Sequence, residues 1–175
     1  MGGEEVDAFW SNSPMNLIEK GRRQIMEQAA QAFGPMMRHM FEGLGAMSRA
    51  FYEKCGEEAL PIIAEGAAKS GVRQGEMMQK MMPVKSMKDI GEMFKMMGGM
   101  MGMEMEVVEL SDDTLHFKAP KCMLGIEGTS QGLCEAMMNS DKKMMSTLLG
   151  REVEMKIPKS VAAGDKECEV IFSSK

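Results

Sequence analysis

The sequence predicts an α+β protein in which N-terminal helices pack on a four-stranded antiparallel sheet. Along the first half of the chain, apolar residues recur at steps of three and four, which is the period of an amphipathic helix. Along the second half they alternate with polar residues, in the order strand, strand, helix, strand, strand. The chain has 175 residues and is 44% apolar, which suffices for one hydrophobic core.

The first 70 residues carry signals for three helices. Ser13 followed by Pro14 is typical of a helix start, and Gly34 is expected to stop that helix. A third helix is expected at residues 57–70, and Gly71 follows it directly in the sequence. Pro35 opens the second helix, whose expected apolar stripe consists of Met36, Met37, Met40, Leu44, Met47 and Phe51.

The segment from residue 76 to 105 is rich in methionine, of which the chain contains 25. Ser86 is expected to cap a helix that ends at Gly98 and Gly99. The methionines have three interpretations: lining of the core and of an apolar pocket, a groove for a partner protein, or a Cu(I) thioether site. Charged residues such as Lys88 interleave with them as on an amphipathic helix, which favours the first interpretation.

Two hairpins around one helix are expected in the second half. The strands and the helix fall, in chain order, at residues 103–107, 114–118, 130–149, 151–157 and 166–172. Alternation turns Leu115 and Phe117 inward and His116 outward. Gly164 and Asp165 are expected to make the turn of the second hairpin.

Composition excludes several classes of protein. The net charge of −5 and the single Trp and single Tyr argue against a nucleic-acid partner. No stretch approaches the roughly 20 apolar residues of a membrane span. Glu4 and Glu5 stand where a secretory signal would be basic, so we expect a cytoplasmic protein with reduced cysteines.

Short motifs carry a resemblance to a known group of proteins. Residues 162–172 fit the pattern AxGDxxCxxxF, and they follow a Gly-rich lead-in at 98–102, Cys122 and the helix that carries Cys134. The run Gly56-Glu57-Glu58-Ala59-Leu60 lies upstream. With these motifs the chain resembles the 4-vinyl-reductase-type small-molecule-binding domains and their relatives in the L-2-amino-thiazoline-4-carboxylate hydrolase family.

This resemblance implies a fold like that of the transport-tethering (TRAPP) subunits, with helices on a twisted four-stranded antiparallel sheet. It also implies a homodimer and an apolar cavity for a hydrocarbon-like ligand. The matching part of the chain leaves residues 1–34 as an N-terminal helical extension. Residues 35–175 then form a single ligand-binding domain.

Zinc enters only through the resemblance, because some 4-vinyl-reductase-type domains hold it with cysteines and an acidic residue. Cys134 and Cys168 match two of those cysteine positions. Ser160 stands where a third cysteine would be, and Met155 stands near the acidic position. A structural zinc site needs four N, S or O ligands. The resemblance therefore implies no certain metal, with Cys134 and Cys168 as the ligands of a zinc ion if one is bound.

Three cysteines are expected to share one interior space. Helix phase turns Cys134 inward, strand alternation does the same for Cys168, and Cys122 follows the second strand closely. They are interpreted as buried thiols that act as small hydrophobes, as ligand or metal contacts, or as a nucleophile. A nucleophilic cysteine usually has a histidine beside it. The chain offers only His39 and the outward-facing His116, which weakens that interpretation.

Asp141 follows Cys134 by two helical turns and lies close to the same helix face, with Met138 between them. A carboxylate near an apolar face needs a partner. One interpretation is a boundary residue that reaches solvent or Lys142. The other is a polar anchor in the pocket, which would orient a ligand amine or take a proton.

These features predict a small-molecule-binding domain, with a sensory role as one form of it and an apolar, Met-lined pocket. The expected ligand contacts are Cys122, Cys134, Met138, Asp141 and Cys168. The alternative is a hydrolase of a small cyclic amide-like substrate, acting on a non-peptide C–N bond, whose catalytic residues the sequence does not identify. A metal-binding or partner-docking protein is a further alternative.

Overall fold

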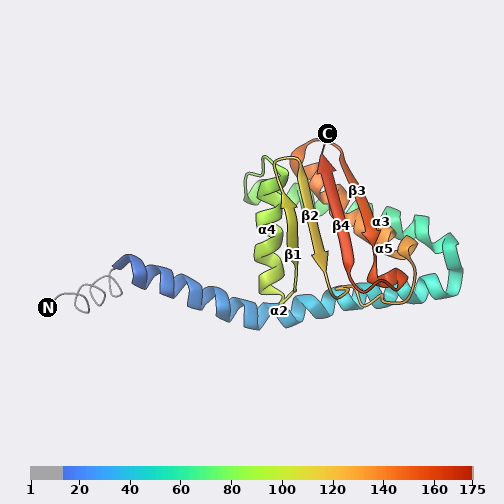
Figure 1. Ribbon diagram of the computed structural model, residues 1–175, viewed down its shortest axis with the longest axis horizontal. Helices are drawn as coiled ribbons and strands as arrows, with labels where there is room; N and C mark the ends of the chain where they lie inside the picture. The colour runs from blue at the N-terminus through green and yellow to red at the C-terminus, as the bar shows by residue number, and fades with distance from the viewer. Residues whose placement is uncertain (1–13, 175) are drawn as a thin grey trace.

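The computed structural model describes residues 14–174 and confirms the predicted α+β class. Long helices lie behind a four-stranded sheet (Figure 1). The elements are, in chain order, α2 (Pro14–Cys55), η1 (Gly56–Glu58), α3 (Ala59–Met81), α4 (Met87–Met100), β1 (Glu106–Leu110), β2 (Thr114–Ala119), α5 (Gln131–Leu149), β3 (Val153–Lys159), η2 (Val161–Ala163) and β4 (Cys168–Ser174).

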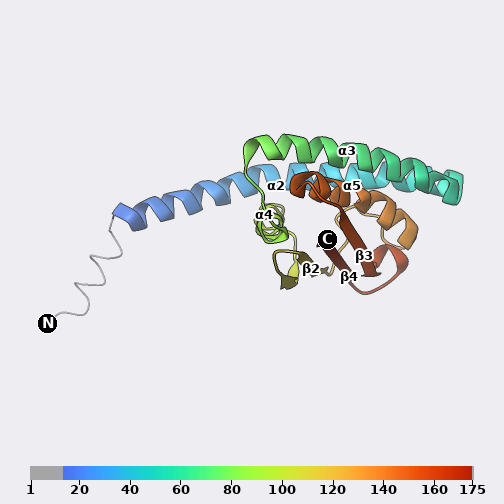
Figure 2. The ribbon, with the colours of Figure 1, turned by 90° about the horizontal axis from the view of Figure 1, so that it is seen from above.

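The sheet is antiparallel throughout, with the strand order β1-β2-β4-β3. Leu115 pairs with Phe172 and Phe117 with Val170 across the two central strands, so their inward side chains form one apolar row. The rings of Phe117 and Phe172 stack with centroids 6.4 Å apart. This row packs with buried residues of α4 and α5 in the hydrophobic core, on the side of the sheet where Figure 2 shows the helices.

The predicted break in the first helix is wrong, because α2 continues through Gly34 and Pro35. A side chain at Gly34 would collide with the carbonyl oxygen of Met100, so the glycine permits a close contact with α4. Ser13, the predicted cap, lies outside the described residues. The predicted division of the chain after residue 34 stays a prediction.

The predicted end of the third helix near Ser70 is also wrong, because the glycine that follows it permits a close helix contact and does not end the helix. α3 continues through Gly71 and Gly75, where α5 crosses it closely. A Cβ at Gly71 would overlap the carbonyl oxygen of Ser140, and one at Gly75 would lie 2.6 Å from the Cβ of Thr147. These glycines are therefore packing positions inside the helix, although glycine also ends helices.

The cap of α4 is confirmed and its predicted end is wrong. Ser86 Oγ accepts from the Asp89 amide at 3.3 Å, and Asp89 Oδ2 accepts from the Ser86 amide at 3.1 Å. The helix runs beyond Gly98 and closes at Gly102, which has a φ of +66°. The Met103 amide donates to the Gly98 carbonyl oxygen at 2.8 Å, so Met103 completes the helix end and the first strand begins only at Glu106.

The remaining elements follow the prediction closely. α5 is capped by Ser130, whose hydroxyl accepts from the Leu133 amide at 3.1 Å, and ends at Gly150. The last two strands begin two residues later than expected. A later start does not change which residues of a strand face inward, and Val153 and Phe172 are fully buried. Within residues 14–174, no helix combines the length and apolar character that crossing a membrane requires.

We expect Gly71→Ala to lower the free energy of unfolding by about 1–3 kcal/mol, because the new methyl group forces α3 and α5 apart. Gly66 is the matched control, since nothing lies within 4 Å of a Cβ at this position of the same helix. Gly66→Ala should be neutral or stabilise by up to about 1 kcal/mol through helix propensity. Urea denaturation followed by circular dichroism measures both variants, and equal effects would contradict the close crossing.

Candidate functional site

The structure brings together three of the predicted cysteines. Cys134 lies on α5 and is buried, Cys168 begins β4, and Cys122 lies in the loop between β2 and α5; the latter two are partly buried. All three are free thiols. Burial is the main cause that raises the pKa of Cys134 to about 11, and the charges that Cys168 and Cys122 would carry add to it. Cys134 is therefore protonated and weakly nucleophilic at neutral pH.

The β3–β4 turn presents Ser160 to this cluster. The Ser160 amide donates to Asp165 Oδ2 at 2.8 Å, and the Asp165 amide donates back to the Ser160 carbonyl at 3.1 Å. Gly164 has a φ of +100°, which confirms the predicted turn residues. The Val161 amide donates to Cys168 Sγ at 3.4 Å. The motif around residues 160–168 therefore folds into a turn that holds a thiol and a hydroxyl side by side.

The Ser160 side chain is fully buried, and its hydroxyl has no N or O partner within the described part of the chain. The hydroxyl lies beside the Cys134 thiol and lowers the pKa of Cys134, against the larger effect of burial. Sulfur is a weak hydrogen-bond partner, so the hydroxyl keeps unused capacity. A buried polar atom in this state is a candidate ligand contact.

Asp141 has the most unusual environment of the predicted site residues. It shares a face of α5 with Cys134 and with Met145, which is fully buried. The residue as a whole is half-buried, and within residues 14–174 its carboxyl forms no hydrogen bond or ion pair, so the interpretation as a partner of Lys142 is not supported. Desolvation alone raises the pKa of the Asp141 carboxyl from 3.8 to about 6. It can therefore exchange a proton near neutral pH.

Met138 is half-buried against the hydrophobic core, beside the Cys134 face of α5. Several methionines of the Met-rich segment are core residues, among them Met87 and Met93, whereas Met77, Met81 and Met96 are exposed. Two open depressions of the surface lie at the edges of the sheet. One of about 460 Å³ is lined by Glu135 and residues 155–158, and one of about 420 Å³ lies at the ends of β1 and β2. The Met-lined pocket stays a prediction.

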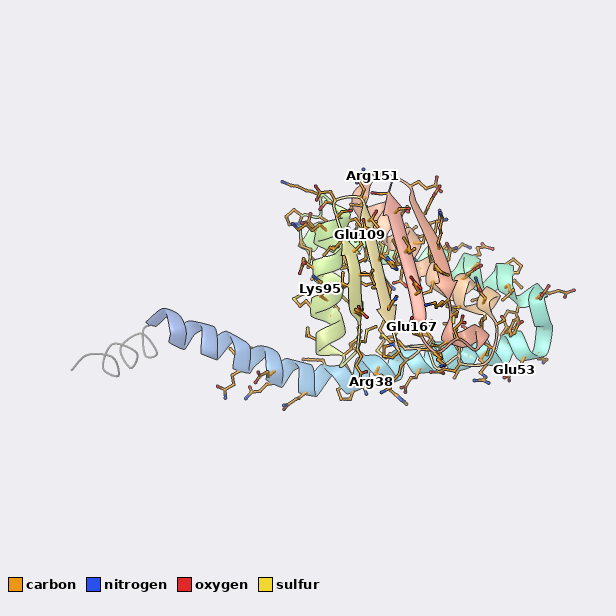
Figure 3. All side chains as sticks on the ribbon, viewed as in Figure 1. Arg38, Glu53, Lys95, Glu109, Arg151 and Glu167 are labelled. Carbon is orange, nitrogen blue, oxygen red and sulfur yellow. The ribbon has the colours of Figure 1, made fainter. Side chains whose placement is uncertain are left out.

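The outer face of the sheet carries a charged network that the sequence analysis did not identify. His116 Nε2 lies 3.0 Å from Glu169 Oε1, and Lys159 donates to Glu167 at 3.0 Å and lies 3.2 Å from Glu169. Figure 3 shows Glu167 at the lower end of the sheet. Hydrogen bonds from Lys159 and then His116 hold the pKa of the Glu169 carboxyl below its usual range. His116 therefore pairs with Glu169 on the outer face and does not face the thiols. Charged residues at alternate positions of the strands were the sequence signal that could have predicted this network.

Zinc stays untested at Cys134 and Cys168. Across residues 14–174, no three His, Cys, Asp or Glu side chains are arranged to hold one metal ion. Ser160 and Met155 add an alcohol and a thioether, which are not the usual ligands of zinc. No step at this site is therefore assigned to a metal.

Comparisons with known proteins agree with this fold. The family model described as L-2-amino-thiazoline-4-carboxylic acid hydrolase matches residues 22–172, as the resemblance implied. The phenol-responsive sensory domain of the transcription activator PoxR, solved with phenol, superposes with a TM-score of 0.56 at 17% identity. The alignment covers 77% of this chain and 74% of that one. At this identity the likeness shows the fold alone.

A further structural match is a trafficking protein particle complex subunit 3 from Naegleria fowleri, covalently bound to palmitic acid. Its TM-score is 0.47 at 16% identity, covering 87% of this chain and 96% of that one. A search of curated protein sequences produced no match.

We expect Asp141→Asn to stabilise the protein above pH 6. The folded-state pKa of about 6 exceeds the value of 3.8 without burial, so stability falls as the pH rises between these values and the full cost remains above them. A shift of about two pKa units corresponds to at most about 3 kcal/mol, and we expect a gain of about 1–3 kcal/mol at pH 8.

Urea denaturation of wild type and variant from pH 4.5 to pH 8 measures this gain. The difference between the two proteins should shrink toward the acidic end. Asp112→Asn, at an exposed turn, is the control and should change little at any pH. A difference that is the same at every pH would show that Asp141 is not desolvated.

Proposed function

Because this chain belongs to the L-2-amino-thiazoline-4-carboxylic acid hydrolase family, we propose that it binds a small cyclic molecule at the sheet-facing side of α5. The observation that carries the proposal is the unpaired, desolvated carboxyl of Asp141. An ionised carboxylate without a partner destabilises a folded protein. A ligand that brings a basic nitrogen would supply that partner.

The thiol cluster supplies the apolar side of the proposed site. The free thiols of Cys122, Cys134 and Cys168 present soft, weakly polar surface, and Met138 adds an adaptable apolar side chain. The free hydrogen-bonding capacity of Ser160 gives one directed contact. Apolar walls with a few placed polar groups are typical of small-molecule sites. We infer a ligand with an amine or amidine group on a compact ring, held in a Met- and Cys-lined pocket.

The names of similar proteins support this ligand class. The family description names a 2-amino-thiazoline ring, whose amidine-type nitrogens match a carboxylate. The sensory domain of similar fold binds phenol, another small ring. A sensory role, a homodimer and a cytoplasmic location belong to the same proposal, and a zinc ion at Cys134 and Cys168 is the alternative to a pocket lined by free thiols. Metal analysis of the purified protein tests the last of these.

The second candidate function is hydrolysis of such a ring, which the family description supports. With a pKa of about 6, Asp141 suits a general base that activates water. Cys134 suits a nucleophile poorly, because its thiol has a pKa of about 11 and His116 is bound to Glu169 on the other face of the sheet. In a hydrolase of this kind, the carboxyl would carry the reaction.

Binding is tested by isothermal titration calorimetry at pH 7.5 with L-2-amino-thiazoline-4-carboxylic acid and with phenol. We expect the aminothiazoline to bind wild type and to bind Asp141→Asn at least tenfold more weakly, because the charge pair is lost. Glu135→Gln is the matched control on the same helix, since Glu135 lines the open depression beside β3. Loss of binding in this control but not in Asp141→Asn would move the site to that depression.

Hydrolysis is tested by following loss of L-2-amino-thiazoline-4-carboxylic acid by liquid chromatography with mass detection. If the chain is a hydrolase, Asp141→Asn should lower kcat by about 100-fold or more, as expected for loss of a general base. Cys134→Ser should retain most activity. Full loss in Cys134→Ser would instead identify a thiol nucleophile, and binding without turnover would leave the binding function alone.

A further inference from the structure

Three contacts of helix α2 with the rest of the protein lie on one face of the helix. Gly34 lies against the Met100 backbone, and Gly45 lies against the Leu124 carbonyl. Arg38 Nη2 donates to the Met101 carbonyl at 2.7 Å, and Figure 3 shows Arg38 where α2 passes beneath the sheet. The N-terminal part of the described helix extends well beyond the body of the protein (Figure 1).

A different face of α2 carries an exposed apolar stripe. Its five residues are 52–72% exposed, although each is a large hydrophobic side chain. At 3.6 residues per turn they fall within an arc of about 80° on the helix. Gly34 and Gly45 lie well outside this arc. We call this surface the α2 stripe; it consists of Phe33, Met36, Met40, Leu44 and Met47.

The α2 stripe is free of charge. The charged residues between positions 33 and 49 are Arg38, Glu42 and Arg49, and helical geometry places each of them more than about 100° from the stripe. The usual amphipathic helix turns its charged face to solvent and its apolar face to the core. In α2 the apolar face is the uncovered one. Soluble monomers rarely expose more than a few hundred Å² of contiguous apolar surface, so the stripe indicates an interface.

The spacing of the stripe is symmetric about its centre. Its residues are separated by steps of three, four, four and three, with Met40 in the middle. When a second α2 lies antiparallel across a twofold axis at Met40, Phe33 meets Met47 of the other copy and Met36 meets Leu44. Each copy then presents the same patch to the other, which is the requirement of a twofold homodimer.

We propose that two copies of this chain associate through antiparallel pairing of their α2 stripes, with Met40 on the twofold axis. A second copy of the chain is the partner that fits this surface, because the stripe is complementary to itself. The stripe carries no charge that would favour a partner of opposite charge. Gly43 favours the same packing, since nothing lies within 4 Å of a Cβ there and the same twofold axis sets it opposite Met37 of the other copy.

The size of the surface suits a dimer. A helix of 42 residues is about 63 Å long, so the interface is not limited to one turn. Each copy contributes on the order of several hundred Å² from the stripe alone, near the roughly 800 Å² per partner of a standard interface. This pairing supplies the interface of the proposed homodimer. It does not depend on the proposed ligand, because the ligand site lies on α5 and α5 contributes no residue to the stripe.

Disulfide cross-linking of single-cysteine substitutions tests the geometry. In a Cys55→Ser background, which removes the exposed native thiol of α2, Met40→Cys should form a disulfide-linked dimer in high yield under mild oxidation. Met47→Cys should not, because antiparallel helices hold its two copies about 21 Å apart, beyond the reach of a disulfide. Met81→Cys, on an equally exposed site of α3, is the background control.

Two cross-linking results would overturn the proposal. Efficient linkage of both α2 variants would indicate parallel helices, and linkage of neither above the level of Met81→Cys would exclude this surface. Only linkage of Met40→Cys alone supports the twofold axis at Met40.

Sedimentation measurements on the full chain provide a second test. Wild type should be a dimer, and Met40→Glu, which sets two like charges on the axis, should weaken dimerisation at least tenfold with an unchanged circular dichroism spectrum. Met81→Glu should leave the dimer intact. A monomeric wild type, or a dimer that withstands Met40→Glu, would overturn the proposal, as would a monomer that binds phospholipid vesicles through the stripe.

Discussion

The position of α5 depends on two glycines of α3, which have no side chain to keep the two helices apart. Gly71 and Gly75 let the two helix backbones approach so closely that a methyl group at either position would collide with α5. On its other side α5 packs on the sheet through buried residues such as Met145. The glycines therefore determine how far α5, with Cys134 and Asp141, lies from the sheet. The candidate site depends on the close packing of α3 and α5.

Two polar groups of that layer are not satisfied by the protein itself. Within residues 14–174, the desolvated carboxyl of Asp141 has no hydrogen bond or ion pair, and the buried hydroxyl of Ser160 has no N or O partner and lies beside the Cys134 thiol. Each costs free energy of folding. Sites that bind or react often retain such groups, because the ligand completes their interactions.

Helix α2 has the opposite arrangement to a helix that covers a core. Glycines and two arginines, Arg38 and Arg49, contact the body, whereas the five large apolar side chains of the α2 stripe are exposed. The helical period predicted four of its five residues, missed Phe33, and added Met37 and Phe51, which are partly buried. A helical period does not tell whether the stripe faces a core or another molecule, because the spacing is the same in both cases.

The sequence by itself determined the element types and the inward residues of the strands, because periods of 3.6 and two are local properties. Inward residues such as Val153 stayed correct even where strand ends moved. Only the tertiary structure decided that Gly34 and Gly71 are packing positions, since a glycine that ends a helix and one that admits a neighbour look alike in sequence. The tertiary structure also decided that the three thiols lie together and that, within residues 14–174, Asp141 has no partner. Both features depend on segments that are far apart in the chain.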